Sequence, residues 1–305
     1  MIKTVVAYAA GVPNAHKNPH KVQALSDFIQ GVNTCGDKGI LHTGSNIMDS
    51  DVNLIQGWVH KGSVMSPHLR VRKQAVDIAK ASGKHSFIID SNLFNYDIGK
   101  MHPMQYLRYS MDGVFPVTGN YFKDNIDPTK WKHLSSDLGL TLKDWRTRGV
   151  HILICTQRNG GWSMGGLSVV DWLNKTVDEL RQYTDRPIIV RGHPGDKNAS
   201  KYLKSNKWQV SVKPKLTQDL ANAHATITYN SSPGVASAIE GIPLFVTDPN
   251  PKMSQAFDVA NTDLSKIETP NTFERQTWVE GLAMSHWKFQ ETKSGAAWAH
   301  MKQYI

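Results

Sequence analysis

Residues 226–246 constrain the fold of this chain more than any other stretch. They read as a short apolar strand, a polar turn at 230–232, a short helix that begins at Pro233, and a second apolar strand. A helix N-terminus presents unpaired N–H groups and a partial positive charge, and proline suits the first helical position. The stretch therefore predicts a strand-helix-strand crossover whose turn is either a phosphate seat or an ordinary serine cap.

The same alternation of strands and helices runs through most of the chain. Apolar strands are expected at residues 3–8, 52–59, 86–90, 151–156, 187–191 and 208–212, and helices at 21–32, 69–81, 168–183 and 217–223. Strands that alternate with helices predict parallel sheets with crossover helices. The sequence therefore predicts an α/β protein with doubly wound sheets.

The domain organisation follows from length and from one irregular segment. A chain of 305 residues exceeds the usual size of one domain. Residues 93–150 are rich in aromatic residues, Pro, Gly, Asn and Asp, and we expect their first part to line a cleft. We place the boundary between domains 1–148 and 149–305, with the two closing helices, 272–286 and 295–304, free to return to the first domain.

Composition limits the class of protein. No apolar run approaches the 18 residues of a membrane span, and the first ten residues predict a strand rather than a signal peptide. The two cysteines, Cys35 and Cys155, form neither a disulfide framework nor a metal set. We therefore expect a protein of the reducing cytoplasm, without a membrane partner. The net charge of +9 favours polyanionic partners such as nucleic acid, anionic glycans or nucleotide phosphates.

Three glycine-bearing turns follow strands in the second half, at residues 158–166, 191–196 and 230–234. Because the carboxyl ends of parallel strands meet at one edge, all three should face one crevice. Arginine pairs well with phosphate oxygens, and a histidine can donate a hydrogen bond to them. The alternatives are a surface arginine and a turn histidine that caps its strand. The candidate donor-binding residues are Arg158, Asn159, Gly160, Gly161, Arg191, His193, Asn230, Ser231, Ser232 and Gly234.

Two of these turns carry a resemblance. Arg-Gly-His-Pro-Gly at 191–195 resembles the HisPro motif of bacterial sialyl-, polysialyl- and capsular Kdo-type glycosyltransferases. Asn-Ser-Ser-Pro-Gly at 230–234, followed by Glu-Gly-Ile-Pro at 240–243, resembles their SerSer motif and the Gly-x-Pro strand entry. The resemblance covers about residues 150–250. It implies that His193, Ser231 and Ser232 bind the phosphates of a nucleotide sugar.

The resemblance also implies an architecture and a donor. The fold would be GT-B-like, with two Rossmann-like domains that face a central cleft, the acceptor on the side of 1–148 and the donor on 149–305. The donor would be a UDP-sugar or else a CMP-sugar, with no metal clearly required. One position departs from the pattern, because Ala236 stands where many GT-B enzymes have a ribose-binding glutamate, and the nearest acid is Glu240.

A second resemblance concerns the acceptor. Arg-Asn-Gly-Gly-Trp-Ser-Met at 158–164 and Ser-Gly-Ala-Ala-Trp-Ala-His at 294–300 are similar to segments of glycosyltransferase-like proteins of tailed phages. Phages of that kind glycosylate hydroxymethylated cytosine in their own DNA, inside the host cell. The analogy implies double-stranded DNA as partner. Its phosphates would contact Arg70, Arg72, Lys73 and Arg108, which could equally be a solvated helix face and core residues.

Transfer to a hydroxyl requires a general base. The candidates are Asp112 and Asp90, with His16 and His20 as a further option and ordinary turn or loop residues as the alternative. The rival functions are a glycosyltransferase of surface or capsular polysaccharide, a non-catalytic nucleotide-sugar or DNA-binding protein, and a sugar-nucleotide epimerase. The sequence leaves the sugar, the stereochemical outcome and the oligomeric state open.

Overall fold

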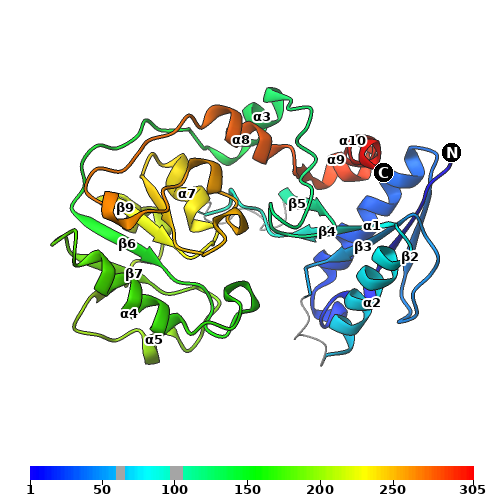
Figure 1. The fold of residues 1–305 in the computed structure, drawn as a ribbon. Helices are drawn as coiled ribbons and strands as arrows, with labels where there is room; N and C mark the ends of the chain where they lie inside the picture. Colours follow the sequence, from blue (N-terminus) through cyan, green and yellow to red (C-terminus); the bar gives the residue numbers. More distant parts are fainter. Residues whose placement is uncertain (60–65, 97–105) are drawn as a thin grey trace. The chain divides into compact units, whose positions relative to one another are not determined.

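The structure, a computed structural model, describes residues 1–59, 66–96 and 106–305. The chain forms two compact units (Figure 1). Unit 1 comprises Met1–Asn92, Lys100–Lys130 and Gly281–Ile305, and unit 2 comprises Leu93–Gly99 and Trp131–Glu280. Residues 131–148, which the sequence predicted to lie in the first domain, belong to unit 2, and residues 281–305 belong to unit 1.

Unit 1 contains a six-stranded sheet of order β11-β5-β4-β3-β1-β2. Strands β1, β2, β3 and β4 are parallel, β5 is antiparallel to β4, and β11 is antiparallel to β5. The strands are β1 (Thr4–Tyr8), β2 (Lys38–His42), β3 (Val52–Gln56), β4 (His85–Asp90), β5 (Tyr106–Met111) and β11 (His286–Lys288).

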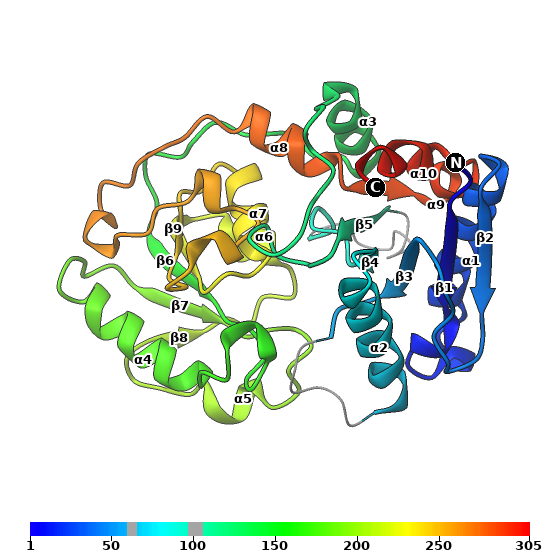
Figure 2. The ribbon, with the colours of Figure 1, turned by 45° about the vertical axis from the view of Figure 1, so that its right-hand side comes forward.

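Helices cover both faces of this sheet. Helix α1 (Pro19–Thr34) packs with α9 (Phe289–Lys293) and α10 (Ala296–Met301) on one face, so the last helices lie beside the first one (Figures 1 and 2). Phe28 of α1 and Trp298 of α10 meet edge to face there, in a core that also buries Val5 and Ala7 of β1. Helix α2 (Pro67–Ala81) packs against β3 and β4.

Unit 2 contains a five-stranded parallel sheet of order β10-β9-β6-β7-β8. Its strands are β6 (His151–Cys155), β7 (Ile188–Arg191), β8 (Gln209–Val210), β9 (Ala223–Thr228) and β10 (Leu244–Val246). Along β6, Ile152 and Ile154 face the α4 side, whereas Leu153 and Cys155 face the α6 and α7 side. This alternation is that of a strand buried on both faces.

The helices of unit 2 are short apart from α4. The α4 side is covered by α4 (Val169–Leu180), and the opposite side by α6 (Leu216–Leu220) and α7 (Pro233–Ile239). Ser168 caps α4 by accepting from the Asp171 N–H (3.3 Å), as its sequence position suggests. The remaining helices are α5 (Ala199–Tyr202) in unit 2, and α3 (Pro128–Leu138) and α8 (Gln276–Ala283), each of which crosses a unit boundary.

Three strands of unit 1 have no counterpart among the expected elements. Strand β2 follows α1 directly, β5 lies inside the segment expected to line a cleft, and β11 begins at His286, where the helix expected at 272–286 was to end. All six residues of β5 are buried, so this part of the segment is sheet and not a cleft wall. Within the described residues, no helix is both long and apolar enough to cross a membrane.

Candidate functional site

The turns after β6, β7 and β9 lie at the same level of the unit 2 sheet. In the strand register, Cys155 at the end of β6 is paired with Arg191 on one side and with Thr228 on the other. The three turns therefore follow the same edge of the sheet, as the strand order predicts. Neighbouring strands lie about 4.8 Å apart, so the turns after β7 and β9, on either side of β6, are roughly 10 Å apart at their origins.

A buried amide fastens two of these turns to each other. The Asn230 side chain accepts a hydrogen bond from Gln157 Nε2 (2.9 Å) and donates to the Ser163 carbonyl (3.0 Å) and to Asp248 Oδ2 (2.6 Å). Asn230 is only 4% exposed. Its side chain is thus committed to the protein, and its role is to position the turn after β9 rather than to contact a ligand.

His193 projects from the turn after β7 with a defined tautomer. Its Nδ1 accepts a hydrogen bond from the Gly195 N–H (2.9 Å), and its backbone N–H donates to Thr156 Oγ1 (3.2 Å). Burial, and then the charge of Arg158, lowers the pKa of His193. The ring is therefore neutral at pH 7, and the remaining proton is on Nε2, where it can be donated to an anionic ligand.

Arg158 lies beside His193. A methyl group at Gly195 would come within 2.5 Å of Arg158 Nη2 and 3.1 Å of His193 Cε1. The guanidinium is exposed, and no described carboxylate forms an ion pair with it. An unpaired cation and a neutral N–H donor therefore flank a glycine that leaves the space between them open.

The serine turn contributes a hydroxyl without a partner. Ser231 Oγ is buried and, among the described residues, has no hydrogen-bond partner, and the same holds for Gln157 Oε1. A buried polar atom of this kind needs a ligand or a water to satisfy it. Ser232 is the N-cap of α7, yet its side chain makes no capping bond. Both hydroxyls are therefore available at the end of β9.

Four other predicted donor-binding residues have structural roles. The Arg191 guanidinium pairs with the buried Asp219 (2.6 Å) and donates to the carbonyls of Lys213 and Pro214, so it holds the β8–α6 loop and is not free for a phosphate. Asn159 Oδ1 accepts from the first N–H of α4 (3.1 Å). Gly160 has a positive φ of 68°, and a methyl group at Gly161 would lie 2.8 Å from the Arg158 carbonyl.

Gly234 also departs from its expected role. A methyl group there would meet Leu244 at 3.2 Å and Ala256 at 3.5 Å. The glycine therefore lets α7 pack against β10, and it does not open the backbone to a ligand.

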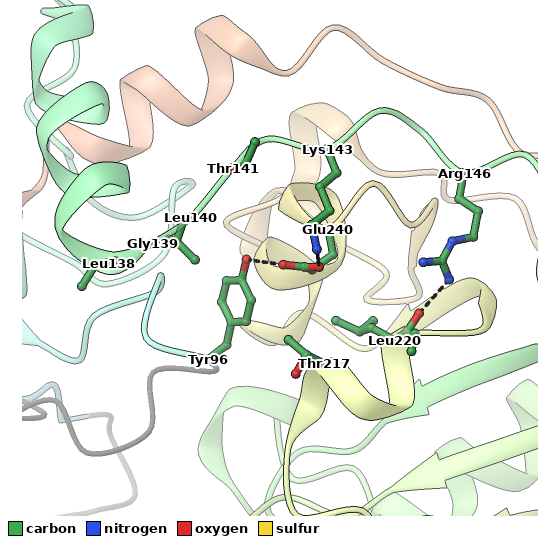
Figure 3. Close-up of a pocket in the computed structure, with 11 residues that line it drawn as sticks. Tyr96, Leu138, Gly139, Leu140, Thr141, Lys143, Arg146, Thr217, Leu220 and Glu240 are labelled. Atoms are coloured by element: carbon green, nitrogen blue, oxygen red, sulfur yellow. Dashed lines mark hydrogen bonds and ion pairs between the residues drawn. The ribbon is translucent and has the colours of Figure 1, made fainter.

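A separate pocket of about 550 Å³ lies elsewhere in unit 2 (Figure 3). Tyr96 donates to Glu240 (3.2 Å), Lys143 forms an ion pair with the same carboxylate, and Arg146 donates to the Leu220 carbonyl (2.8 Å). Glu240 is the C-cap of α7, which starts at the carboxyl edge of the sheet, so this pocket lies toward the amino edge. Glu240 therefore does not replace the ribose-binding glutamate that Ala236 lacks.

The two candidate bases lie at opposite ends of β4. Asp90 ends this strand, whereas Asp112 follows β5 and bonds His85 (2.7 Å) and the Ser86 N–H (2.8 Å) at its start. Six strand residues separate these positions by roughly 17 Å. Of the two alternative candidates, only Asp90 lies at the carboxyl edge of the unit 1 sheet. Asp112, with a φ of 62°, is a turn residue held by its neighbours.

The four cations expected to contact DNA do not share one surface. Arg70 is exposed, and Lys73 forms an ion pair with Asp77 one helical turn further along α2. Arg72 and Arg108 are buried, at 7% and 6% exposure, and Arg108 pairs with Asp90. The structure thus corrects the prediction for these two arginines, because the backbone of a duplex cannot reach them.

Sequence reasoning missed the residues that support the turns. Thr156 and Gln157 follow β6 directly, and Asp248 comes two residues after β10. Asp196 accepts from the Tyr202 hydroxyl (2.6 Å) and from the Asn159 N–H (3.0 Å), which in that order lower the pKa of its carboxyl group. Their position in the sequence could have indicated this role, since each of these polar residues comes shortly after the end of a strand.

Two Rossmann-like α/β units in one chain are the architecture of the GT-B fold, which confirms the predicted fold class. The structure is similar to that of Thermosulfurimonas dismutans KpsC, beta Kdo 2,7 transferase, with a TM-score of 0.56 and 12% identity over 97% of this chain and 99% of that chain. It is also similar to the beta Kdo 2,4 transferase of KpsC from this organism, with a TM-score of 0.57 and 12% identity over 93% and 90%.

At this level of identity the similarity shows a shared fold. No family model matches the sequence, and no curated protein matches it. Within the described residues, no group of three or more His, Cys, Asp and Glu side chains is arranged to hold a metal ion.

Proposed function

We propose that this protein is a glycosyltransferase that uses a nucleotide-sugar donor, and that unit 2 binds the donor diphosphate at the carboxyl edge of its sheet. The observation that carries the proposal is the pairing of a neutral His193, protonated on Nε2, with the unpaired Arg158 guanidinium across Gly195. The unsatisfied Ser231 hydroxyl at the neighbouring turn supports it. The spacing of roughly 10 Å between the outer turns suits a diphosphate.

These groups would act on the leaving diphosphate. In the transfer, an acceptor oxygen bonds to the anomeric carbon of the sugar, the bond from that carbon to the diphosphate breaks, and the acceptor proton passes to a base. Negative charge then develops on the diphosphate. A positioned N–H donor and a guanidinium stabilise that charge more in the transition state than in the bound donor. Asp90 is the proposed base in unit 1.

The donor proposed is a UDP-sugar, whose leaving group is a diphosphate, or else a CMP-sugar, whose single leaving phosphate the same groups would bind. Ala236 cannot bind a ribose hydroxyl through its side chain, and Glu240 is bonded to Tyr96 and Lys143 near the far end of α7. The ribose contact must therefore come from another group, such as a backbone carbonyl.

For the acceptor we propose a hydroxyl of a surface or capsular glycan. The burial of Arg72 and Arg108 and the pairing of Lys73 leave Arg70 as the exposed, unpaired member of the predicted DNA-contacting set. The two similar KpsC structures are named as Kdo transferases, which supports the glycan. Hydroxymethylated cytosine in phage DNA is the alternative acceptor, favoured by the net charge of +9.

A thermal-shift screen tests the donor proposal first. UDP-, CMP-, GDP- and ADP-sugars are added to the purified protein, alone and with hydroxymethylated duplex DNA or an acidic oligosaccharide. A ligand that binds only the native state raises its melting temperature. We expect a shift with one nucleotide class, smaller in His193→Ala and retained in full in His85→Asn. No shift with any nucleotide would refute the donor site, and a shift enhanced by modified DNA alone would replace the glycan acceptor.

A further inference from the structure

Arg72 in α2 is a buried cation with little to neutralise it. It is 7% exposed, and its Nε donates to the Gly11 carbonyl (2.6 Å). Within the part of the chain that the structure describes, its two terminal nitrogens make no hydrogen bond and no ion pair. Burial lowers the pKa of Arg72 to about 10, although the nearby Asp90 opposes the shift. A buried charge without a partner costs several kcal/mol, so its retention calls for an explanation.

The guanidinium lies at the carboxyl edge of the unit 1 sheet. Helical side chains tilt toward the N-terminus of their helix, which brings Arg72 back toward the start of α2. A methyl group at Gly57, which follows β3, would lie 2.9 Å from Arg72 Nη1. Gly57 therefore leaves open the space that a side chain would otherwise fill beside the terminal nitrogens.

The first turn of α2 adds positive potential at the same place. Ser66 is the N-cap, its side chain makes no capping bond, and the first turn contains no acidic residue. This 15-residue helix thus presents its partial positive charge without an internal anion. His68, in the first turn, has a pKa lowered by burial and then by the charge of Arg72.

The carboxylate nearby does not balance these charges. Asp90 forms an ion pair with the buried Arg108, and no ion pair links it to Arg72. The buried Arg72 and Arg108 thus both lie near one carboxylate, that of Asp90, which pairs only with Arg108. Together these three charged groups carry a net charge of +1. His68 adds none when it is neutral.

We propose that Arg72 and the first turn of α2 form an anion-binding subsite that holds a carboxylate or phosphate group of the acceptor. The word acceptor rests on the proposed glycosyltransferase function, whereas the anion subsite does not. A guanidinium with two free terminal nitrogens binds either group through paired N–H bonds. Gly57, which lies beside Arg72, donates its N–H to the carbonyl of Ile89 (2.7 Å), the residue before the proposed base Asp90, so a bound anion would place its own molecule near that base.

Binding of small probes in the absence of any nucleotide tests the subsite. Glucuronate and glucose differ mainly in one carboxylate, and isothermal titration with each measures what that group contributes. We expect glucuronate to bind the wild-type protein and glucose to bind at least tenfold more weakly. Arg72→Gln should lose this preference. Arg70→Gln removes an exposed arginine from the same helix and should keep it.

Further variants separate this site from the donor site. His193→Ala should bind glucuronate like the wild type. In this variant inorganic phosphate should no longer bind at the donor site but should still bind at Arg72, and this remaining binding is the part that Arg72→Gln abolishes. Arg72→Lys keeps the positive charge, so it should fold. It loses the planar guanidinium group, so it should bind glucuronate at least threefold more weakly. It serves as the test if Arg72→Gln does not fold.

The outcomes are distinct. Equal glucuronate affinity in the wild type and in Arg72→Lys or Arg72→Gln overturns the subsite, as does equal affinity for glucose. Glucuronate binding that depends on Arg72, in a protein that binds no nucleotide, supports the subsite while the proposed function fails. Nucleotide-dependent transfer that is indifferent to Arg72 leaves the function standing and removes the subsite.

Discussion

The backbone N–H of Gly195 donates a hydrogen bond to Nδ1 of His193 at 2.9 Å. This contact fixes the imidazole as an acceptor at Nδ1, so its single proton at neutral pH is held on Nε2. The same glycine leaves room for Arg158 Nη2. One glycine thus sets the tautomer of His193 and leaves room for the guanidinium of Arg158 next to it.

Replacement of His193 tests the role of this proton. His193→Ala should weaken nucleotide-sugar binding about tenfold, the usual size of a lost hydrogen bond to a charged group. The melting temperature should change little because the ring is only half buried. Isothermal titration measures the affinity. His85→Asn, which alters the exposed His85–Asp112 pair of unit 1, is the matched control and should bind the nucleotide normally.

Substitutions of Arg158 and Arg191 should have different effects, the first on nucleotide binding and the second on stability, although the sequence predicts the same role for both residues. Arg158→Gln removes an unpaired surface guanidinium, so we expect about tenfold weaker nucleotide binding and less than 0.5 kcal/mol of stability change. Arg191→Gln leaves Asp219, which is 3% exposed, without its cation and should lower the free energy of unfolding by about 3 kcal/mol. Urea titration and calorimetry on both variants compare the two effects. The reverse pattern would mean that Arg191 is the phosphate ligand after all.

Gly195→Ala probes the space between His193 and Arg158. The backbone at Gly195 does not have a positive φ, so alanine fits its conformation. The added methyl chiefly displaces the flexible end of Arg158, 2.5 Å away, and it also contacts the His193 ring at 3.1 Å. We expect native stability and several-fold weaker nucleotide binding. In the Arg158→Gln background the same substitution should have little further effect, since neighbouring residues are not additive. An additive loss would show that the glycine acts independently of Arg158.

The sequence predicts that the turns after β6, β7 and β9 meet at one edge of the sheet, because strands alternate clearly with helices in the second half of the chain. The sequence could not distinguish the residues that are free to contact a nucleotide from those that hold the turns in place. Arg158 and Arg191 are both arginines near a strand end, and only the fold places Asp219 beside the second. Asn230 likewise reads as a phosphate-binding residue, while its partners Gln157 and Asp248 come from two other strand ends.

Unit 1 was harder to predict for a related reason. The antiparallel strand β5 contains Arg108 and Tyr109, so its residues read as an irregular polar and aromatic segment although every one is buried. Its direction also decides where Asp112 lies. A parallel strand would have brought Asp112 to the carboxyl edge, and the antiparallel one takes it to the start of β4.

This geometry gives opposite expectations for the two aspartates. Asp90→Asn should reduce the transfer rate by at least 100-fold, the usual contribution of a general base, with unchanged nucleotide affinity. It also leaves Arg108 without its carboxylate, so the rate must be measured on protein shown to be folded by circular dichroism. Asp112→Asn should keep the wild-type rate. A rate loss confined to Asp112→Asn would reverse the assignment.

His286 makes folding depend on pH away from the site. It is fully buried in β11, and burial lowers its pKa to about 3, against the weaker opposing effect of the Leu282 carbonyl. The unfolded histidine has a pKa near 6.5, so below that pH the unfolded chain binds a proton that the native state refuses. The stability contribution is therefore complete above pH 6.5 and is lost as the pH falls toward about 3, by about 1.4 kcal/mol per pH unit.

Urea unfolding at pH 7 and pH 5 measures this dependence. Between these values the wild-type protein should lose about 2 kcal/mol more of its unfolding free energy than His286→Gln, whatever the absolute stability of the variant, because glutamine does not titrate. His133→Gln changes an exposed histidine and should follow the wild type. Equal losses in the wild type and in His286→Gln would show that water reaches this ring in the folded state and that β11 is not sealed against β5.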